Sequence, residues 1–206
     1  MAQVKTSNAW MREHVNDSYV KLAKKEGFRS RAAYKLLEIN ERDRILKRGM
    51  VVVDLGAAPG SWSQVALHQV GNQGAVVALD ILEMEPLPGV MIIKDDFREE
   101  SAVQMLDHML AGRRPDVIIS DMAPNISGIR VSDQAHSIYL AELALHFAMD
   151  KLNCGGSFLV KLFQGSSFDQ FMQVMRGGFR KVLVRKPKAS RDRSNEVYLL
   201  GLEKKS

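Results

Sequence analysis

The spacing of hydrophobic positions changes once along the chain. Up to about residue 48 they recur every three to four residues, which predicts amphipathic helices over 8–25 and 30–46, the second with Ser30 as its N-cap. Beyond that point the apolar positions form short, nearly continuous runs, as in parallel strands that are buried on both faces. The strands are expected over 50–55, 75–79, 90–93, 116–121 and 157–163, and helices between them over 61–70, 99–111, 134–152 and 167–177.

Strands that alternate with helices indicate an open, doubly wound α/β sheet. The end of the chain departs from this order, because the apolar runs 179–185 and 196–202 are separated only by a polar, basic loop, which predicts an antiparallel pair. A mostly parallel sheet that ends in such a pair is typical of the Rossmann-like class I methyltransferases that use S-adenosyl-L-methionine (SAM). We therefore expect one such domain over 49–206, with an N-terminal basic helical extension, 1–48, packed on it.

Composition narrows the class of protein. The 206 residues are 46% hydrophobic and 26% charged, close to the average of soluble globular proteins, which excludes a disordered or membrane-embedded chain. The single cysteine, Cys154, excludes a disulfide framework and favours a reducing compartment. The five histidines show no metal-ligand spacing, so no metal is expected. Without an apolar leader or a membrane-spanning run, the chain is expected to be cytoplasmic, to contact no membrane and to need no state beyond a monomer.

The distribution of charge says more than the net charge of +5. Residues 1–48 carry a net charge of +6 and residues 176–206 one of +7, whereas residues 49–175 carry −8. If the two basic ends meet in space, they would form a basic rim around an acidic pocket. Such a rim suits a polyanion, although a merely solvated basic face is the ordinary alternative.

The first strand of the predicted sheet runs into a tight loop of small residues, and ligands of doubly wound sheets bind at this edge. The loop lacks the second glycine of a dinucleotide fingerprint, having Ala58 there and then Pro59, and no Walker Gly-Lys-Ser/Thr follows. It is therefore poorly equipped for phosphate, which argues against an oxidoreductase. SAM carries no phosphate, and Gly56 and Gly60 would let the backbone approach its methionine part.

Carboxylates follow three successive strands of the predicted sheet. Asp54 could accept a hydrogen bond from the amino group of SAM, and Asp80 is placed to accept both ribose hydroxyls. Asp96, followed by Phe97, could accept from the adenine amino group. Taken singly, Asp80 and Asp96 could each be an ordinary loop or helix cap. Three carboxylates together with the loop make a shared site the better interpretation.

Lys161 lies inside an apolar strand, where desolvation disfavours its charged form unless a carboxylate accompanies it. Asp121, at the end of the preceding strand, could provide that carboxylate. One interpretation is a buried ion pair that only fixes the sheet. The other is a proton acceptor beside the methyl donor, oriented by Asp121.

Five ordered motifs across nearly the whole chain resemble the RrmJ/FtsJ family of SAM-dependent ribosomal RNA 2′-O-ribose methyltransferases. They are SRAAYKL at 30–36, DLGAAPGSW at 54–62, SDMAPN at 120–125, VKLFQG at 160–165 and RSNEVY at 193–198. The likeness is strongest to the bacterial members, which methylate a uridine ribose of large-subunit (23S) ribosomal RNA. Ser61 departs from the pattern, because relatives often have a second glycine there.

The resemblance implies functions for particular residues. The family's Lys-Asp-Lys-Glu tetrad would fall on Lys35, Asp121, Lys161 and Glu196, with Lys161 as the proton acceptor. Its SAM contacts would fall on Gly60, Trp62, Asp80, Asp96 and Asp121. Without the motifs, Lys35 would be interpreted as a solvated helix lysine and Glu196 as a strand-edge partner for nearby arginines.

The resemblance also implies a substrate, ribosomal RNA in an assembled or assembling large subunit, which the basic ends could hold through phosphates. A SAM methyltransferase for proteins or small molecules would not need so much flanking charge. An RNA-binding assembly factor without catalysis would not need an intact tetrad. The cations expected to contact phosphates are Arg12, Lys21, Lys24, Lys25, Arg29, Arg31, Arg185, Lys186, Lys188, Arg191 and Arg193. The aromatic side chains among the first six, Trp10, Tyr19, Phe28 and Tyr34, are expected to pack the helices rather than to stack on bases.

Overall fold

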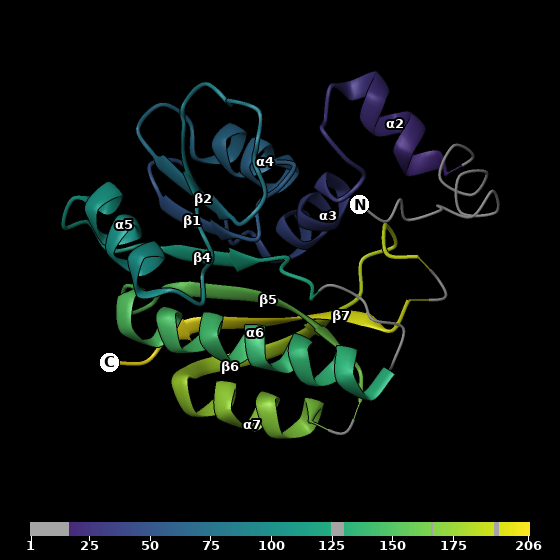
Figure 1. Cartoon of the computed structure of the whole chain (residues 1–206), viewed down its shortest axis with the longest axis vertical. Helices are drawn as coiled ribbons and strands as arrows, with labels where there is room; N and C mark the ends of the chain where they lie inside the picture. The colour runs from purple at the N-terminus through teal and green to yellow at the C-terminus, as the bar shows by residue number, and fades with distance from the viewer. Residues whose placement is uncertain (1–16, 125–129, 166, 192–193) are drawn as a thin grey trace, which may run out of the picture.

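The computed structural model describes residues 17–124, 130–165, 167–191 and 194–206. The strands in these ranges form one sheet in the order β3-β2-β1-β4-β5-β7-β6 (Figure 1). They lie within a few residues of the runs that the hydrophobic pattern predicts. Their bounds are β1 Val51–Leu55, β2 Ala75–Asp80, β3 Val90–Lys94, β4 Val117–Ser120, β5 Ser157–Phe163, β6 Phe179–Arg185 and β7 Glu196–Lys204.

The strand order reverses at β1, which pairs in parallel with β2 on one side and with β4 on the other. Connections therefore leave the carboxyl ends of β1 and β4 toward opposite sides, and a crevice at such a point is the usual ligand site of these folds. The predicted antiparallel pair is confirmed, and β7 lies between β5 and β6, antiparallel to both. This order places Lys161 on β5 directly opposite Tyr198 on β7.

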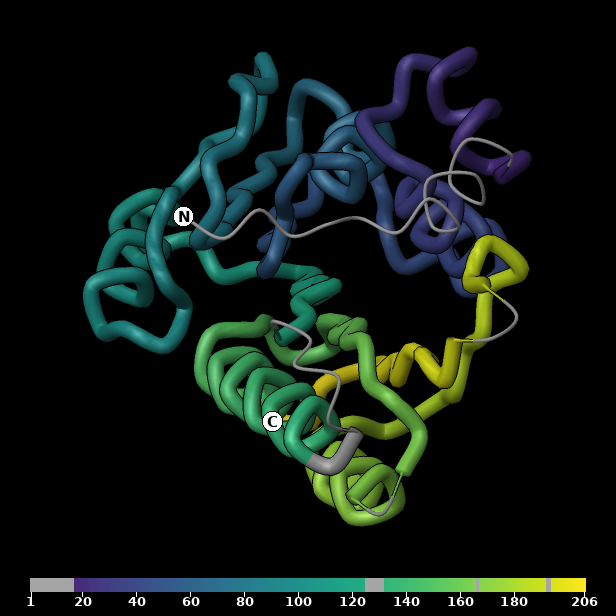
Figure 2. The backbone as a smooth tube through the Cα atoms, turned by 45° about the vertical axis from the view of Figure 1, so that its right-hand side comes forward, coloured from purple at the N-terminus to yellow at the C-terminus, as the bar shows by residue number. Residues whose placement is uncertain are grey.

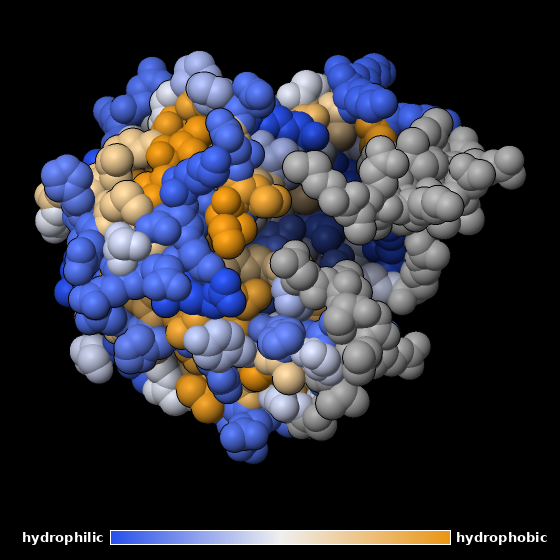
Figure 3. All heavy atoms as spheres, in the orientation of Figure 1, coloured by the Kyte–Doolittle hydropathy of each residue, from blue (hydrophilic) through white to orange (hydrophobic). Residues whose placement is uncertain are grey.

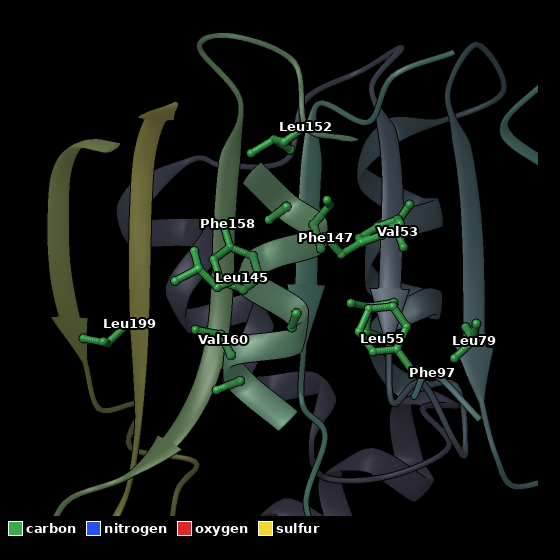
Figure 4. Close-up of a cluster of buried hydrophobic side chains, with 14 of the residues drawn as sticks. Val53, Leu55, Leu79, Phe97, Leu145, Phe147, Leu152, Phe158, Val160 and Leu199 are labelled. Carbon is green, nitrogen blue, oxygen red and sulfur yellow. The ribbon is translucent and has the colours of Figure 1, made fainter. Parts of the chain in front are cut away.

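Helices cover both faces of the sheet. Residues with side chains on one face, such as Val53 and Leu55, join a core beneath three helices, and their neighbour Val52 belongs to a second core on the other face (Figures 1 and 4). The first core lies under α5 (Glu100–Leu110), α6 (Arg130–Lys151) and α7 (Phe168–Gly178), the second under α3 (Ala33–Asp43) and α4 (Ser61–Val70). No helix of the described part of the chain is long and apolar enough to cross a membrane.

The first predicted helix falls partly outside the described residues, which contain α2, Ser18–Glu26. The predicted N-cap of the second helix was wrong. Ser30 forms a hydroxyl–hydroxyl hydrogen bond of 2.7 Å with Ser61, and α3 begins only at Ala33. The helix also ends earlier than its pattern predicts, because Arg44 adopts a left-handed conformation with φ of 51°.

The two basic ends of the chain meet in space, as the sequence suggests they could. The connection between β6 and β7 lies beside α2 and α3 (Figure 2). Glu38 on α3 accepts hydrogen bonds from the backbone N–H groups of Lys188, at 2.7 Å, and Ala189, at 3.0 Å. Two arginines add to this contact, because Arg31 donates to the backbone carbonyl of Ala189 and Arg185 pairs with Asp43 on α3.

Candidate active site

The loop between β1 and α4 is shaped by contacts within the chain. Gly56 has φ of +75°, and a Cβ there would lie 2.5 Å from Met122 Cγ and 2.9 Å from its backbone. Gly60 has φ of +106°, and its Cβ would lie 2.8 Å from Arg29 Nη1. Both positions therefore need glycine for reasons of backbone and packing alone. The predicted approach of SAM to these glycines remains a prediction.

Asp80 joins the end of β2 to this loop. One of its carboxylate oxygens accepts from the backbone N–H of Ala58 at 2.8 Å, and the other accepts from that of Leu82 at 2.8 Å. A carboxylate oxygen can accept more than one hydrogen bond, so both oxygens keep acceptor capacity. The carboxylate is thus oriented at the carboxyl edge of the sheet, where the sequence predicts a ribose contact.

The surroundings of Asp54 show whether the residues of the site fit SAM. Its side chain is fully buried, Oδ2 accepts a 2.6 Å hydrogen bond from the hydroxyl of Ser63, and Oδ1 has no partner among the described residues. Burial, together with the negative charges of Asp121 and Asp80, raises the pKa of Asp54 to about 7, against the hydrogen bonds from Ser63, which lower it. A buried acceptor without a donor fits an amino cation, and the residues present are therefore compatible with SAM.

Three of the predicted SAM contacts are engaged with the protein itself. The Asp96 carboxylate accepts hydrogen bonds from the Arg98 guanidinium, and these lower the pKa of Asp96. The Phe97 ring packs in the core against Phe147. Trp62 on α4 is buried and donates its indole N–H to the Ala32 carbonyl at 2.8 Å. The structure thus explains all three residues by packing or local hydrogen bonds, and their contact with SAM stays a prediction.

Lys161 and Asp121 lie together at the carboxyl ends of β5 and β4. Lys161 Nζ is 3.0 Å from Asp121 Oδ1 and also donates to the Asp121 backbone carbonyl, and the lysine side chain is only 7% exposed. Burial raises the pKa of Asp121, but the charges of Lys161 and Lys35 and the hydrogen bonds from Lys161 and Tyr198 lower it by more, so the net shift is downward.

Lys35 and Glu196 form a second ion pair, 2.6 Å between Nζ and Oε1. Tyr198 connects the two pairs, because its hydroxyl donates to Asp121 Oδ1 at 2.9 Å while Lys35 Nζ lies 5.7 Å from the centre of its ring. The structure therefore brings the four tetrad residues into one connected group. In the view of Figure 1, a hollow with a hydrophilic floor opens at the carboxyl end of β4 (Figure 3).

Sequence reasoning missed the part of Tyr198 in this group. The residue is completely buried, and its ring packs 5.6 Å from that of Trp62. A signal was available, because Glu196 and Tyr198 are two apart on one strand and therefore point to the same face. Burial of polar atoms raises the pKa of Tyr198 well above its usual value, and the nearby carboxylates of Asp121 and Glu196 raise it further, so the hydroxyl keeps its proton and donates.

The basic residues divide into two groups. The guanidinium groups of Arg29, Arg31 and Arg185 bind acceptors of the protein itself, and their contact with phosphate stays a prediction. Lys186 also donates to a backbone carbonyl, that of Ser194. The side chains of Lys21, Lys24, Lys25 and Lys188 are exposed and Arg191 is half-buried, whereas Arg12 and Arg193 lie outside the described residues, as does Asn125 of the SDMAPN motif.

The aromatic residues near α2 pack as expected. Tyr19, Phe28 and Tyr34 form ring contacts with one another, with centroids 5.4 to 5.6 Å apart. Trp10 lies outside the described residues. In the described ranges, no three His, Cys, Asp or Glu side chains are grouped so that they could hold a metal.

Known proteins resemble the chain over its whole length. Ribosomal RNA large subunit methyltransferase E of Nitrosomonas eutropha is 60% identical over 204 residues, 99% of each chain, and that of Chromobacterium violaceum is 58% identical over 201 residues, 98% of each. A solved structure from Plasmodium falciparum, described as a ribosomal RNA methyltransferase, superposes with a TM-score of 0.78 at 31% identity and covers 86% of this chain and 98% of its own. The family described as FtsJ-like methyltransferase matches residues 28–204, and the chain belongs to that family.

Proposed function

We propose that the protein transfers a methyl group from SAM to the 2′-hydroxyl of a ribose in large-subunit (23S) ribosomal RNA. The family supports the methyltransferase activity, and relatives about 60% identical over the full length carry the name ribosomal RNA large subunit methyltransferase E. By the family resemblance the target is a uridine within the ribosomal particle. The protein would act in the cytoplasm, as a monomer.

One observation carries the proposal, the buried contact of Lys161 with Asp121 beside the loop after β1. A ribose hydroxyl is a poor nucleophile near neutral pH, so it needs a group that takes its proton as it attacks. Lys161 is the proton acceptor in this proposal, and Asp121 holds its amine in place through a carboxylate and a backbone carbonyl. General base assistance of this kind is worth about 10²–10⁴-fold in rate.

SAM, when bound, supplies an electrophilic methyl group on a sulfonium. We propose that Asp54, Asp80 and Asp96 hold its amino, ribose and adenine groups, with Gly56, Gly60, Trp62 and Phe97 lining the site through backbone or ring. The unpartnered oxygen of Asp54 supports this assignment. The carboxylates and the cationic ligand would neutralise one another in a site that has no phosphate-binding loop.

Lys35 and Glu196 complete the tetrad in this proposal. A charged Lys35 repels the ammonium form of Lys161, whereas Asp121 and Glu196 favour it. The two ion pairs are linked through Tyr198. Lys161 can accept a proton only as the neutral amine.

The proposal is tested by methylation with tritiated SAM. Large ribosomal subunits and free ribosomal RNA, both from a strain that lacks the enzyme, are the two substrates, and the labelled ribose is mapped by nuclease digestion. We expect one labelled 2′-O-methyluridine in the RNA of the particles. Label that appears only in protein, or on a base instead of a ribose, would overturn the proposal.

A further inference from the structure

Arg29 lies between the two loops that leave the carboxyl ends of β1 and β2. Its Nη1 donates to the backbone carbonyls of Pro59, at 2.9 Å, and Glu85, at 2.8 Å, and its Nη2 donates to the carbonyl of Pro86 at 2.8 Å. One guanidinium thus joins a loop that contains Gly60 to a loop that begins just after Asp80. These are the two loops to which the proposed function assigns the methionine and ribose parts of SAM.

The backbone of Arg29 is fixed as well. Its N–H donates to Oε1 of Gln64 at 2.8 Å, and Nε2 of the same glutamine donates to the Gly27 carbonyl at 3.1 Å. Gln64 lies on α4, which packs on the central part of the sheet. The arginine is therefore held at its backbone by a core helix while its side chain reaches both loops.

The conformation of Gly60 agrees with a close fit to Arg29. A Cβ at Gly60 would meet Arg29 Nη1 at 2.8 Å and Cδ at 3.3 Å, so the missing side chain leaves the space that the arginine fills. The loop after β2 is held besides by the hydrogen bond from Leu82 N–H to Asp80 and by an exposed ion pair between Glu83 and Lys94. Ile81 and Leu82 are 58% and 64% exposed, and Met84 is its buried hydrophobic anchor.

We propose that Arg29 is a positioning residue for the cofactor, which fixes the separation of the loops after β1 and β2 and thereby sets the affinity for SAM. The proposal rests on the proposed function for the identity of the cofactor. It differs from the phosphate contact that the sequence predicts for this arginine, and the experiment below distinguishes the two. Three carbonyl acceptors on two loops require the planar, multidentate fork of arginine, and the single ammonium of a lysine cannot bond all of them in the same geometry.

The test is a calorimetric titration of SAM into the full chain, without RNA. We expect Arg29→Gln and Arg29→Lys each to weaken SAM binding about tenfold or more, at unchanged stoichiometry. Gln64→Ala should weaken it in the same direction but less, because it frees only the backbone of Arg29. Arg113→Gln and Arg113→Lys serve as matched controls, since Arg113 is exposed and precedes β4 at the opposite edge of the sheet.

Two further measurements separate positioning from other functions. In methylation assays the KM for SAM should rise in both Arg29 variants while kcat at saturating SAM stays within about threefold of the parent. Filter binding of the RNA across a salt titration should give the same affinity and slope for Arg29→Lys as for the parent. A loss that came only from unfolding would lower the stoichiometry and leave KM unchanged.

Normal SAM affinity in Arg29→Lys would overturn the inference, and so would weaker RNA binding at normal SAM affinity, which is the result that a phosphate contact predicts. If Arg29→Gln fails to fold, Arg29→Lys and Gln64→Ala still decide the question. Failure of the parent chain itself to bind SAM would refute the proposed function, a result distinct from any difference between parent and variants.

Discussion

At the scale of single residues, the cost of burying charge explains the arrangement of the site. Asp54 and Lys161 are buried and Asp121 is partly buried at the carboxyl ends of neighbouring strands, where an isolated buried charge costs several kcal/mol. Asp121 and Lys161 compensate each other. Asp54 has only a serine hydroxyl, and its carboxyl is therefore half-protonated near pH 7. Its Oδ1 is a buried acceptor without a hydrogen-bond donor among the described residues.

Replacement of Lys161 by alanine tests the proton acceptor. We expect turnover to fall by about 10²–10⁴-fold or more, because the hydroxyl loses its general base, while calorimetry shows SAM affinity near that of the parent. Lys204→Ala is a matched control, since Lys204 is a buried lysine on β7 that donates to the Leu152 carbonyl far from the site. It should lower stability and leave kcat unchanged. Full turnover by the Lys161 variant would refute the assignment.

Replacement of Tyr198 by phenylalanine tests the residue that connects the two ion pairs. The ring still packs against Trp62, but Asp121 loses a hydrogen bond to a buried carboxylate, worth about 1.5–3 kcal/mol. We expect a loss of stability of this size in urea denaturation and a kcat lowered about tenfold.

Tyr34→Phe provides the comparison for Tyr198. It removes a similar hydroxyl, which donates to Glu26 at 2.7 Å and to none of the tetrad residues, although Tyr34 precedes Lys35 in the sequence. This variant should lose stability while kcat stays unchanged. Equal kcat in the two phenylalanine variants would mean that Tyr198 only supports the fold.

The raised pKa of Asp54 predicts a pH-dependent difference in stability. Below pH about 4 the carboxyl is protonated in both the folded and the unfolded chain. Between pH 4 and pH 7 it ionises only in the unfolded chain, so its contribution to the free energy of unfolding falls as pH rises, and above pH 7 the loss is constant. Asp54→Asn removes this dependence. The variant should therefore gain stability relative to the parent from pH 4 to pH 7, by a few kcal/mol.

Urea denaturation at pH 5, 6, 7 and 8, without SAM, measures this difference. Asp169→Asn, an exposed aspartate on α7, is the control and should follow the parent at every pH. A constant difference between Asp54→Asn and the parent across the range would show that Asp54 ionises normally in the folded chain.

At the scale of elements, the pattern of hydrophobic residues in the sequence predicts the positions of strands better than it predicts where helices begin and end. Continuous apolar runs identify β1, β2, β4 and β5, because nearly every residue of these strands is buried, and β3 follows the same pattern although only its Ile93 is buried. The start of α3 depends instead on distant partners. Ser30 could have capped the helix, but it bonds Ser61, and Ala32 accepts from Trp62, so the residues before Ala33 follow the surface of α4.

In the candidate site, too, some residues could be predicted from the sequence and others could not. Asp54, Asp80, Asp121 and Lys161 could be predicted because a position at or near the carboxyl end of a parallel strand fixes a residue's place in the fold. The function of Arg29 could not, since its acceptors are backbone carbonyls of two loops whose proximity no sequence pattern records. An arginine in a basic segment is ordinarily interpreted as a ligand for anions, and here the fold uses it internally.

Glu38 makes the attachment of α3 to the β6–β7 connection testable. Its carboxylate accepts the backbone N–H groups of Lys188 and Ala189, so Glu38→Ala leaves both donors without their partner. We expect trypsin to cut after Lys188 several-fold faster in this variant, as followed by mass spectrometry of the fragments. Glu41→Ala removes an exposed glutamate of the same helix and should be cut at the rate of the parent. Equal rates in both variants would refute a restraining role for Glu38.

At the scale of the whole molecule, the net charge is positive, and acidic and basic residues are concentrated in different parts of the chain. The acidic middle of the chain contributes the carboxylates at the sheet edge, and the two basic ends lie together beside it. Some of the basic side chains hold the ends to each other, because Arg31 donates to the Ala189 carbonyl and Arg185 pairs with Asp43. The remaining exposed cations are the ones available for RNA.

The exposed lysines of α2 give the sharpest test of this division. Lys21, Lys24 and Lys25 lie on the solvent side of the helix, and each that neutralises a phosphate releases a counterion when RNA binds. Replacement of all three by glutamine should weaken RNA binding and make the plot of log affinity against log salt shallower. The slope should change by about 0.7 to 0.9 for each lysine that contacts phosphate.

A second triple variant separates local contact from net charge. Arg113→Gln, Arg176→Gln and Arg180→Gln together remove the same total charge from exposed positions before β4, on α7 and at the start of β6, away from the contact of the β6–β7 connection with α2 and α3. If RNA binds at the joined basic ends, this control keeps the parent slope, and both variants keep the parent affinity for SAM, because the cofactor lies among the carboxylates. Equal slopes for the two triple variants would mean that RNA responds to the overall charge of the protein, and the separated charge would then have no part in placing the substrate.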